Sequence, residues 1–334
     1  MRKTSHGFFL MLCILTLPLA VHANPLGVAS DYNLFMVGSG DLELDPAQRH
    51  SIEQSGTDVG GRVAAVGNVT YTNFSIGSGI PPTDTQPVLV VGGDLVLDSG
   101  SLGANPYQKG TAVVGGSATL TNVGSGGVQS GVSPLPVDFG KEQSYLTGMS
   151  AYWGKLPPSG TTSFGSNSIN LTGQNNLLNV FDISAADIIP HQDFRIYAPF
   201  SSTILINIAG EQANLAEFGF FFNDEPGDEV LNGVQIYNPE YPYSRILFNF
   251  LDAKNILIDL IEINGSLLAP FAKVDFMKDS NIDGNLIASY LIGEGEAHNI
   301  FFEGELPTKP VPEPSTMILF VGGLLGVVAW RRKT

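Results

Sequence analysis

Short apolar stretches that end at a glycine-rich corner recur along the first half of the chain. Four such segments align on a Val-Gly pair, and they begin at Val37, Val66, Val91 and Val114. Each is followed by alternating apolar and polar residues, and the spacings are 29, 25 and 23 residues. Short strands repeated at such a period predict a mainly β protein, a β-solenoid resembling a right-handed parallel β-helix. Glycine suits the corners because it has no Cβ to obstruct a sharp turn.

A second repeat lies near the end of the chain, where Ile263–Ala269 matches Ile282–Ala288. Asn-Gly and Asp-Gly are strong turn dipeptides, so a hairpin is the alternative interpretation. The shared Leu-(Leu/Ile)-Ala ending favours stacked coils instead. Apolar stretches at 194–208 and 246–258 predict buried strands, and the acidic stretch 224–229 predicts an exposed loop.

One segment between the repeats has helical rather than strand periodicity. Phe139, Leu146, Met149 and Trp153 are spaced 7, 3 and 4 residues apart, which places them on one face of a helix. Prolines precede this segment and follow it. We therefore predict one amphipathic helix over 137–155, packed along an apolar side of the solenoid.

The N-terminus has the layout of a secretory signal peptide. A basic start, an apolar run and a small-residue end occupy residues 1–23, which predicts cleavage between Ala23 and Asn24. The single cysteine, Cys13, lies inside this segment, so the mature chain is expected to have neither a disulfide nor a cysteine-bound metal.

The C-terminus is organised in three parts. A proline-rich linker covers 307–314, an uncharged stretch predicts a transmembrane helix over 315–330, and a basic cytoplasmic tail follows at 331–334. The tail includes Arg331, Arg332 and Lys333. The motif Val311, Pro312, Glu313, Pro314 and Ser315, followed by this helix and the basic cluster, resembles the bacterial PEP-CTERM sorting signal. The resemblance implies an exosortase-type sorting enzyme as partner and delivery through the inner membrane to the cell envelope, cell surface or extracellular matrix.

The net charge of the chain further limits the classes of molecule that it is expected to bind. The segment 24–312 contains 11 basic and 31 acidic residues, a net charge of −20. A surface this acidic repels nucleic acid and attracts cations. Acidity that only keeps an exported protein soluble is the alternative.

The body also resembles a known family. The residues that carry the resemblance are 245–250 (Arg-Ile-Leu-Phe-Asn-Phe), 264–270, 281–288 and 301–304 (Phe-Phe-Glu-Gly). With the Val-Gly repeats they look like the choice-of-anchor A family over one domain, 24–306. The resemblance implies a surface-displayed domain joined to a sorting tail, and it brings no catalytic residues.

Catalytic motifs are not found in the sequence. There is no Gly-x-Ser-x-Gly elbow, and His50, His191 and His298 do not have zinc-site spacing. The first hypothesis is therefore a non-enzymatic exported protein that serves in adhesion or the extracellular matrix of a biofilm. The alternative is a polysaccharide lyase or glycoside hydrolase that uses surface Asp and Glu residues, with extracellular polysaccharide as its partner.

Specific residues bear on two binding functions, calcium binding and ice binding. Asp224, Glu225, Asp228 and Glu229 are weak candidates for Ca²⁺ ligands, although a solvated acidic turn is favoured; Asp275, Asp279 and Asp283 would bind a cation only if their loops converge. Ice binding would need unbroken threonine rows. Val96 and Asp98 interrupt the rows that Thr70, Thr72, Thr119 and Thr121 would form, so ice binding is not expected.

Overall fold

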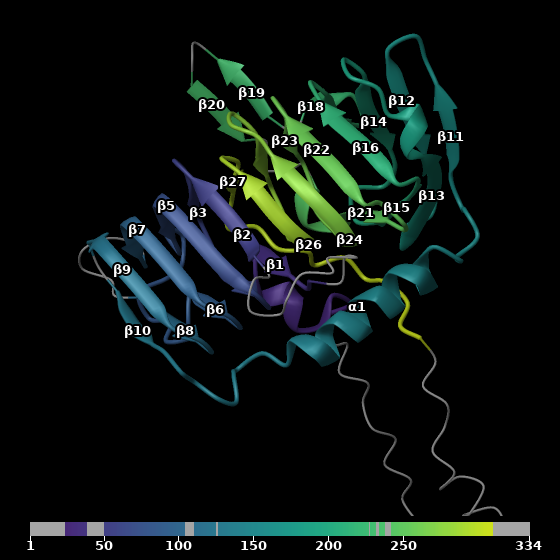
Figure 1. The fold of residues 1–334 in the computed structure, drawn as a ribbon. Helices are drawn as coiled ribbons and strands as arrows, with labels where there is room; N and C mark the ends of the chain where they lie inside the picture. The colour runs from purple at the N-terminus through teal and green to yellow at the C-terminus, as the bar shows by residue number, and fades with distance from the viewer. Residues whose placement is uncertain are drawn as a thin grey trace, which may run out of the picture.

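A computed structural model of the chain describes residues 24–38, 50–103, 110–124, 126–226, 228–231, 234–237 and 242–309, with the backbone alone for 225, 226, 228–231 and 234–237. Within these ranges the protein is a solenoid of parallel strands with one α-helix alongside (Figure 1). The mainly β class, the parallel stacking and the single long helix are therefore confirmed. The right-handed winding stays a prediction.

The coils have three sides. We call the first the helix face. Its parallel strands are, in spatial order, β13 (Leu178–Ser184), β15 (Thr203–Ala209), β21 (Ile246–Phe250), the start of β24 (Ser266–Phe276), the start of β26 (Leu286–Gly293), β1 (Leu34–Met36), β4 (Val63–Ala65), β6 (Leu89–Val91), β8 (Thr111–Val114) and β10 (Gly127–Gln129).

We call the second side the open face. It contains, in spatial order, β16 (Gln212–Ala216), β22 (Asn255–Asp259), the ends of β24 and β26, β2 (His50–Ser55), β5 (Asn68–Ile76), β7 (Leu95–Leu102) and β9 (Ala118–Val123).

The third side is made of shorter ladders. One contains β12 (Ser168–Thr172), β14 (Asp193–Tyr197) and β17 (Gly219–Phe222), with β11 (Thr161–Phe164) and β18 (Glu225–Pro226) as antiparallel edges. The other contains β23 (Glu262–Ile263), β25 (Asn281–Ile282), β27 (Glu296–Ala297) and β3 (Asp58–Val59). A separate hairpin joins β19 (Asp228–Leu231) and β20 (Val234–Tyr237), and short 3₁₀ helices are η1 (Gly27–Asp31), η3 (Ala185–Asp187) and η4 (Tyr243–Arg245).

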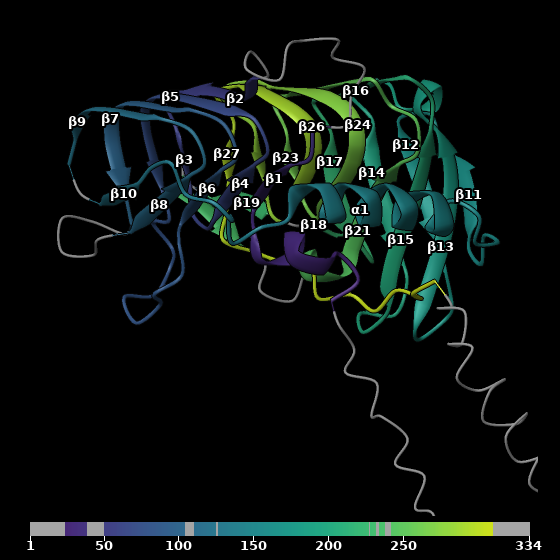
Figure 2. The same ribbon diagram turned by 60° about the horizontal axis from the view of Figure 1, so that its bottom comes forward.

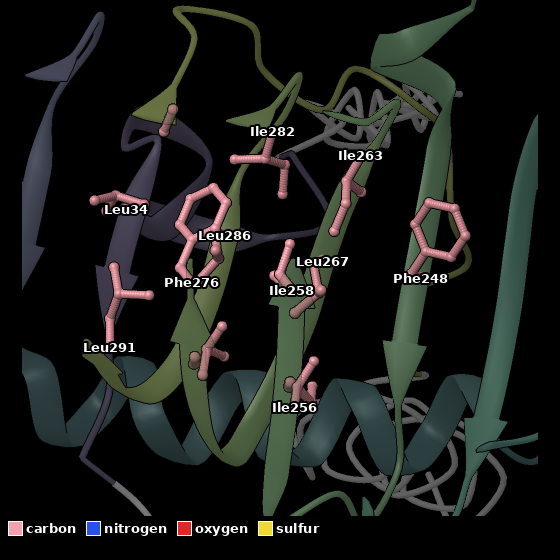
Figure 3. Packing of buried hydrophobic residues seen from close by; sticks show 14 of the residues in the cluster. Leu34, Phe248, Ile256, Ile258, Ile263, Leu267, Phe276, Ile282, Leu286 and Leu291 are labelled. Carbon is pink, nitrogen blue, oxygen red and sulfur yellow. The ribbon is translucent and has the colours of Figure 1, made fainter. Parts of the chain in front are cut away.

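Inward side chains of all three sides form one apolar core. Figure 3 shows Ile258, Ile263, Leu267, Phe276 and Ile282 projecting into the space between the sheets. These five residues are almost completely buried. Burial of an aliphatic or aromatic side chain contributes about 1.5–3 kcal/mol, so the stacked inward rows are the main source of stability.

The coils do not stack in chain order. The chain begins in the middle of the stack at β1 and continues to one end at β10. The helix α1 (Phe139–Trp153) then leads to the other end, from which the later coils return to the middle (Figures 1 and 2). The last coil therefore pairs with the first, because Leu286 lies opposite Leu34 and Ala297 lies opposite Val59.

The predicted helix is confirmed at 139–153. Asp138 accepts a hydrogen bond from the Lys141 backbone N–H and caps its first turn. Phe139, Leu146, Met149 and Trp153 are buried against a row on the helix face, as their spacing predicts. That row includes Val180, Leu205, Leu247, Leu268, Ile287, Phe35, Ala64 and Val90.

Stacking of the second repeat is confirmed in its predicted register. Ile263 pairs with Ile282, and Leu267 and Leu268 pair with Leu286 and Ile287, all in parallel ladders. The hairpin alternative is therefore wrong for this repeat. The predicted loop at 224–229 is also wrong in part, because β18 and β19 extend into it.

The first repeat stacks one residue away from the Val-Gly alignment at one point. Val91 pairs with Ala65 and not with Val66, which instead stands at a corner position that glycine occupies in the next two coils. Ala65 points into the main core, whereas Val66 packs on the outer cluster beside α1. A side chain at Gly92 would meet the Val66 carbonyl oxygen at 2.1 Å, so this corner glycine serves close stacking.

Within the described ranges, no helix combines the length and the apolar character needed to cross a membrane. The predicted signal peptide, the transmembrane helix at 315–330 and the basic tail at 331–334 lie outside these ranges.

Candidate functional site

Polar side chains gather on the third side, where the last coil meets the first. Three stacked polar–apolar–polar triplets supply them, Glu262-Ile-Asn264, Asn281-Ile-Asp283 and Glu296-Ala-His298, and the matching triplet Asp58-Val-Gly60 adds one polar side chain, Asp58. The central apolar residue of each triplet is buried in the main core. Because side chains alternate along a strand, the flanking polar residues lie together on the outer side. We call this group the junction cluster.

Asp283 and His298 are the centre of the junction cluster. The Asp283 side chain is completely buried, and its Oδ1 lies 2.6 Å from His298 Nδ1. Its other oxygen accepts a hydrogen bond from the buried Asn264 at 3.4 Å. A ligand atom of Glu262 lies within 4.8 Å of those of Asp283 and His298. One nitrogen and two carboxylate donors therefore converge from three coils.

A carboxyl pair flanks this centre. Glu296 Oε1 lies 3.6 Å from His298 Nε2. Burial and the negative charge of Asp58 raise the pKa of Glu296, whereas the neighbouring His298 lowers it. Acidic side chains therefore lie on both sides of His298, with Asp283 near Nδ1 and Glu296 near Nε2.

The other two histidines of the described residues form simple exposed pairs. His50 Nδ1 lies 3.4 Å from Glu53 Oε1, and His191 Nδ1 lies 2.8 Å from Glu217 Oε2. The spacing of the histidines along the chain does not single out His298. The repeated triplets are the signal that could have found it, since aligning them places Glu262, Asp283 and His298 on neighbouring coils.

Asp275, Asp279 and Asp283 do not converge on one cation site. Asp275 lies on the open face and forms an ion pair with Lys273 at 2.8 Å, whereas Asp283 is buried on the third side. Asp279 stands in the turn between β24 and β25 with a positive φ of 60°. Only Asp283 belongs to the junction cluster.

The calcium candidates gain no support from the described contacts. Asp224 Oδ1 accepts a hydrogen bond from the Tyr197 hydroxyl at 2.7 Å and lies 3.4 Å from an Arg195 nitrogen. Asp224 therefore shares Arg195 with Asp193, whose Oδ2 lies 2.8 Å from the other guanidinium nitrogen. The side chains of Glu225, Asp228 and Glu229 lie outside the described residues. Calcium binding by this group stays a prediction.

The broken threonine rows are confirmed on the open face. Val96 pairs with both Thr70 and Thr119, and Asp98 pairs with both Thr72 and Thr121. Val96 is 42% exposed, so it presents an isopropyl group in the middle of the row. The outer surface of this face is mixed, with Glu53, Thr70, Val96 and Thr119 in one register row.

The surface hollows of the described chain include two that have a carboxyl group in their lining. A pocket of about 320 Å³ lies between η3 and β16 and includes Asn214, Asn255 and Asp275 in its lining. Another, of about 510 Å³, lies beside the segment that leads into α1 and includes Asp138. Each has one carboxyl group, whereas glycoside hydrolysis uses a pair. The polysaccharide-cleaving alternative gains no support from either.

The predicted targeting residues lie outside the described ranges, but their neighbours are described. Ala23, the motif Val311–Ser315 and the basic residues Arg331, Arg332 and Lys333 are among the residues not described. Asn24, the predicted first residue of the mature chain, donates a hydrogen bond to the Phe302 carbonyl at 2.9 Å. Trp153 Nε1 in α1 donates to the Pro307 carbonyl at 2.9 Å. Both ends of the described chain therefore lie on the helix side, away from the open face (Figure 2).

Comparison with solved structures finds likenesses of low identity. A glycosylated ice-binding protein from an Arctic yeast has 11% identity and a TM-score of 0.34, covering 86% of this chain and 96% of its own. An ice-binding protein domain of Shewanella frigidimarina has 13% identity and a TM-score of 0.30, covering 84% and 97%. An ice-binding protein of the Antarctic ascomycete Antarctomyces psychrotrophicus has 10% identity and a TM-score of 0.27, covering 84% and 98%. Likenesses at this level carry no conclusion about function. No curated protein shows significant similarity to the chain.

Family models match both parts of the sequence. Residues 310–333 match the PEP-CTERM protein-sorting motif, which confirms the predicted sorting signal and implies processing by an exosortase-type enzyme, export and sorting to the cell envelope. Residues 25–299 match an ice-binding-like adhesive domain, so the choice-of-anchor A resemblance stays a prediction. Because that match covers most of its length, the chain belongs to the family of ice-binding-like adhesive domains.

Proposed function

We propose that this protein is an exported, non-enzymatic adhesin that is held at the cell envelope and presents its open face outward. One observation carries the proposal: both ends of the described chain lie on the helix side, while the open face points away from them (Figure 2). A tail that begins after Lys309 would therefore hold the helix side toward the cell. The adhesive-domain match and the sorting motif support the same role.

The targeting steps belong to the same proposal. The signal peptide is removed after Ala23, the helix at 315–330 holds the chain in the inner membrane, and an exosortase recognises Val311–Ser315. The tail is then removed or exchanged, and the domain reaches the surface or the extracellular matrix. A display domain joined to such a tail also agrees with the choice-of-anchor A resemblance.

The surface chemistry of the open face indicates its class of partner. Its outer rows mix hydroxyl, amide, carboxylate and aliphatic side chains, including Thr70, Asn214 and Asp275. Hydroxyl and amide groups suit neutral or cationic polysaccharide, whereas the acidic surface repels anionic polymers. We therefore propose extracellular polysaccharide as the partner, and the interrupted threonine rows argue against ice.

Attachment of cells that display the full chain tests the open face. Val96→Arg and Thr119→Arg place long charged side chains on that face and should reduce attachment to a polysaccharide-coated surface at least tenfold. Val28→Arg is the matched control, because Val28 is 44% exposed but belongs to η1 on the helix side. If all three variants attach as strongly as the parent at equal surface density, the open face is excluded as the adhesive surface.

Replacing Pro312, Glu313 and Pro314 by alanine tests the sorting step separately. The variant should accumulate at the inner membrane with its tail intact, as fractionation and mass spectrometry would show. Normal processing would remove the sorting proposal but leave the role of the open face standing.

A further inference from the structure

We propose that Glu262, Asp283 and His298 form a binding site for a divalent transition-metal cation of the zinc class. Their donor atoms lie within 4.8 Å of one another, although they come from three coils. This inference is independent of the adhesive role, because the junction cluster lies on the third side and not on the open face.

The donor set selects the class of metal. Neutral imidazole nitrogen together with carboxylate oxygen suits Zn²⁺ and its first-row neighbours. Ca²⁺ takes six to eight oxygen ligands and seldom a nitrogen. The junction cluster therefore favours zinc over calcium.

Burial adds a second argument. The Asp283 side chain has no exposed surface, and an ionised carboxylate at such a depth needs a positive partner. His298 meets this need only in part, because its imidazole carries a positive charge only when it is protonated. A divalent cation between Asp283, His298 and Glu262 would neutralise both carboxylates without that proton.

A further oxygen lies in the same place. Asn281 pairs with Glu262 on one side and with Glu296 on the other, and strand alternation places its side chain on their side of the ladder. Its Oδ1 atom is buried and accepts no hydrogen bond from the described residues. A carboxamide oxygen left without a donor beside two carboxylates and an imidazole is the arrangement expected of an additional ligand or of a partner to a bound water.

The position of the site indicates what the metal does. Glu262, Asp283 and His298 belong to consecutive coils of the C-terminal block, and the ladder continues directly from β27 into β3 of the first coil. A bound cation would hold these coils together beside the place where the first and last coils meet. Metal binding should therefore stabilise the whole domain.

Zinc titration of the purified full-length protein, after chelator treatment, tests the proposal. Calorimetry should show one zinc ion bound per chain, and zinc should raise the midpoint of thermal unfolding. His298→Ala and Glu262→Gln should each weaken zinc binding at least tenfold and remove the thermal shift. Calcium at equal concentration should not reproduce it.

Matched variants keep the test decisive. His191→Ala removes another histidine that pairs with a carboxylate, but an exposed one, and should leave zinc binding unchanged. Glu262→Gln changes a partly exposed residue and retains its shape, so it should fold even if His298→Ala does not, and circular dichroism would verify this. Absence of saturable zinc binding, or equal binding by Glu262→Gln and the parent, would overturn the proposal and leave an Asp283–His298 pair that is structural only.

Discussion

The helix face and the open face are built from the same coils, yet they have opposite outer surfaces. On the helix face the outward row is apolar and α1 lies over it, whereas on the open face the outward rows mix charged, hydroxyl and aliphatic groups. Backbone geometry is therefore the same on both sides, and the outward residues alone decide what each side contacts. The helix side therefore buries an outer apolar layer in addition to the shared core, and we propose the open side as the surface for contact with other molecules.

A ladder of one exposed and two buried polar residues adds a polar component to the helix face. Asp182, Asn207 and Asn249 occupy one register row, and Asn249 donates to Asn207 Oδ1 at 2.9 Å. Asn207 and Asn249 also donate to the backbone carbonyls of Trp153 and Ser150. The Trp153 and Ser150 carbonyls also accept the backbone N–H groups of Leu156 and Gly154, so the ladder supplies each of them with a second hydrogen bond at the end of α1.

The largest difference between the faces should follow from Trp153→Ala. Trp153 is completely buried between α1 and the helix face, and its loss should lower the free energy of unfolding by about 4 kcal/mol. Urea denaturation measures this value. Val96→Ala on the open face is the control and should cost less than about 0.5 kcal/mol. Similar losses for the two variants would contradict the proposed division between the faces.

Asn249→Ala should have the next largest effect. It removes the donors to Ser150 O and Asn207 Oδ1 and leaves the Ser150 hydroxyl without its acceptor. Buried polar groups without partners cost about 1–3 kcal/mol each, so we expect a loss of about 3 kcal/mol in urea denaturation. Asn214→Ala, an exposed asparagine of the open face, should be close to neutral. A nearly neutral Asn249→Ala would show that water replaces the ladder.

Tyr71→Phe should produce a smaller change of opposite sign. Tyr71 is completely buried in the core beneath the open face, and its hydroxyl has no hydrogen-bond partner among the described residues. Removing that hydroxyl should raise the free energy of unfolding by about 1 kcal/mol. Tyr32→Phe, which changes a tyrosine on the helix side, should not stabilise. A destabilised Tyr71→Phe would mean that the hydroxyl has a partner such as buried water.

The smallest effect concerns Glu142, the one carboxylate of α1 that faces inward. Burial raises its pKa, although the Ala29 and Val28 backbone N–H groups oppose the shift. An acid whose pKa is higher in the folded state favours folding below its unfolded pKa and loses that contribution as pH rises. Glu142→Gln should therefore be more stable than the parent at pH 7, by less than about 1 kcal/mol, and equal to it near pH 4. Thermal unfolding at both pH values measures the difference, and a gap that does not change with pH would contradict it.

Local patterns in the sequence predicted much of the fold. The helix at 139–153 follows from four apolar residues at helical spacing, and the pairing of Ile263 with Ile282 follows from a gap-free seven-residue alignment with four identical residues. The predicted stacking of Val66 on Val91 is wrong, because Ala65 takes that position. Ala65 and Val66 are both apolar, so only packing decides which of the two points inward.

The junction between the first and last coils could not be predicted in this way. Leu34 and Leu286 are ordinary apolar strand residues, and nothing in either segment indicates that the two pair across so much of the chain. The junction cluster depends on that arrangement, because His298 follows the strand that pairs with β3. Isolated histidines in a sequence therefore said little about their role until the coils were stacked.

Pairing between the first and last coils also sets the order in which the protein can be completed. The edge of β1 that faces β26 stays without a partner until residues near 290 have been made and exported, while the coils from β4 to β10 can already stack. Such long-range pairing makes the closing step slow relative to local stacking. The residues that close the solenoid are followed almost at once by the sorting motif at 310–333. The last strands and the sorting signal therefore emerge at nearly the same time, so a slow closing step would let the sorting enzyme meet a domain that has not yet closed.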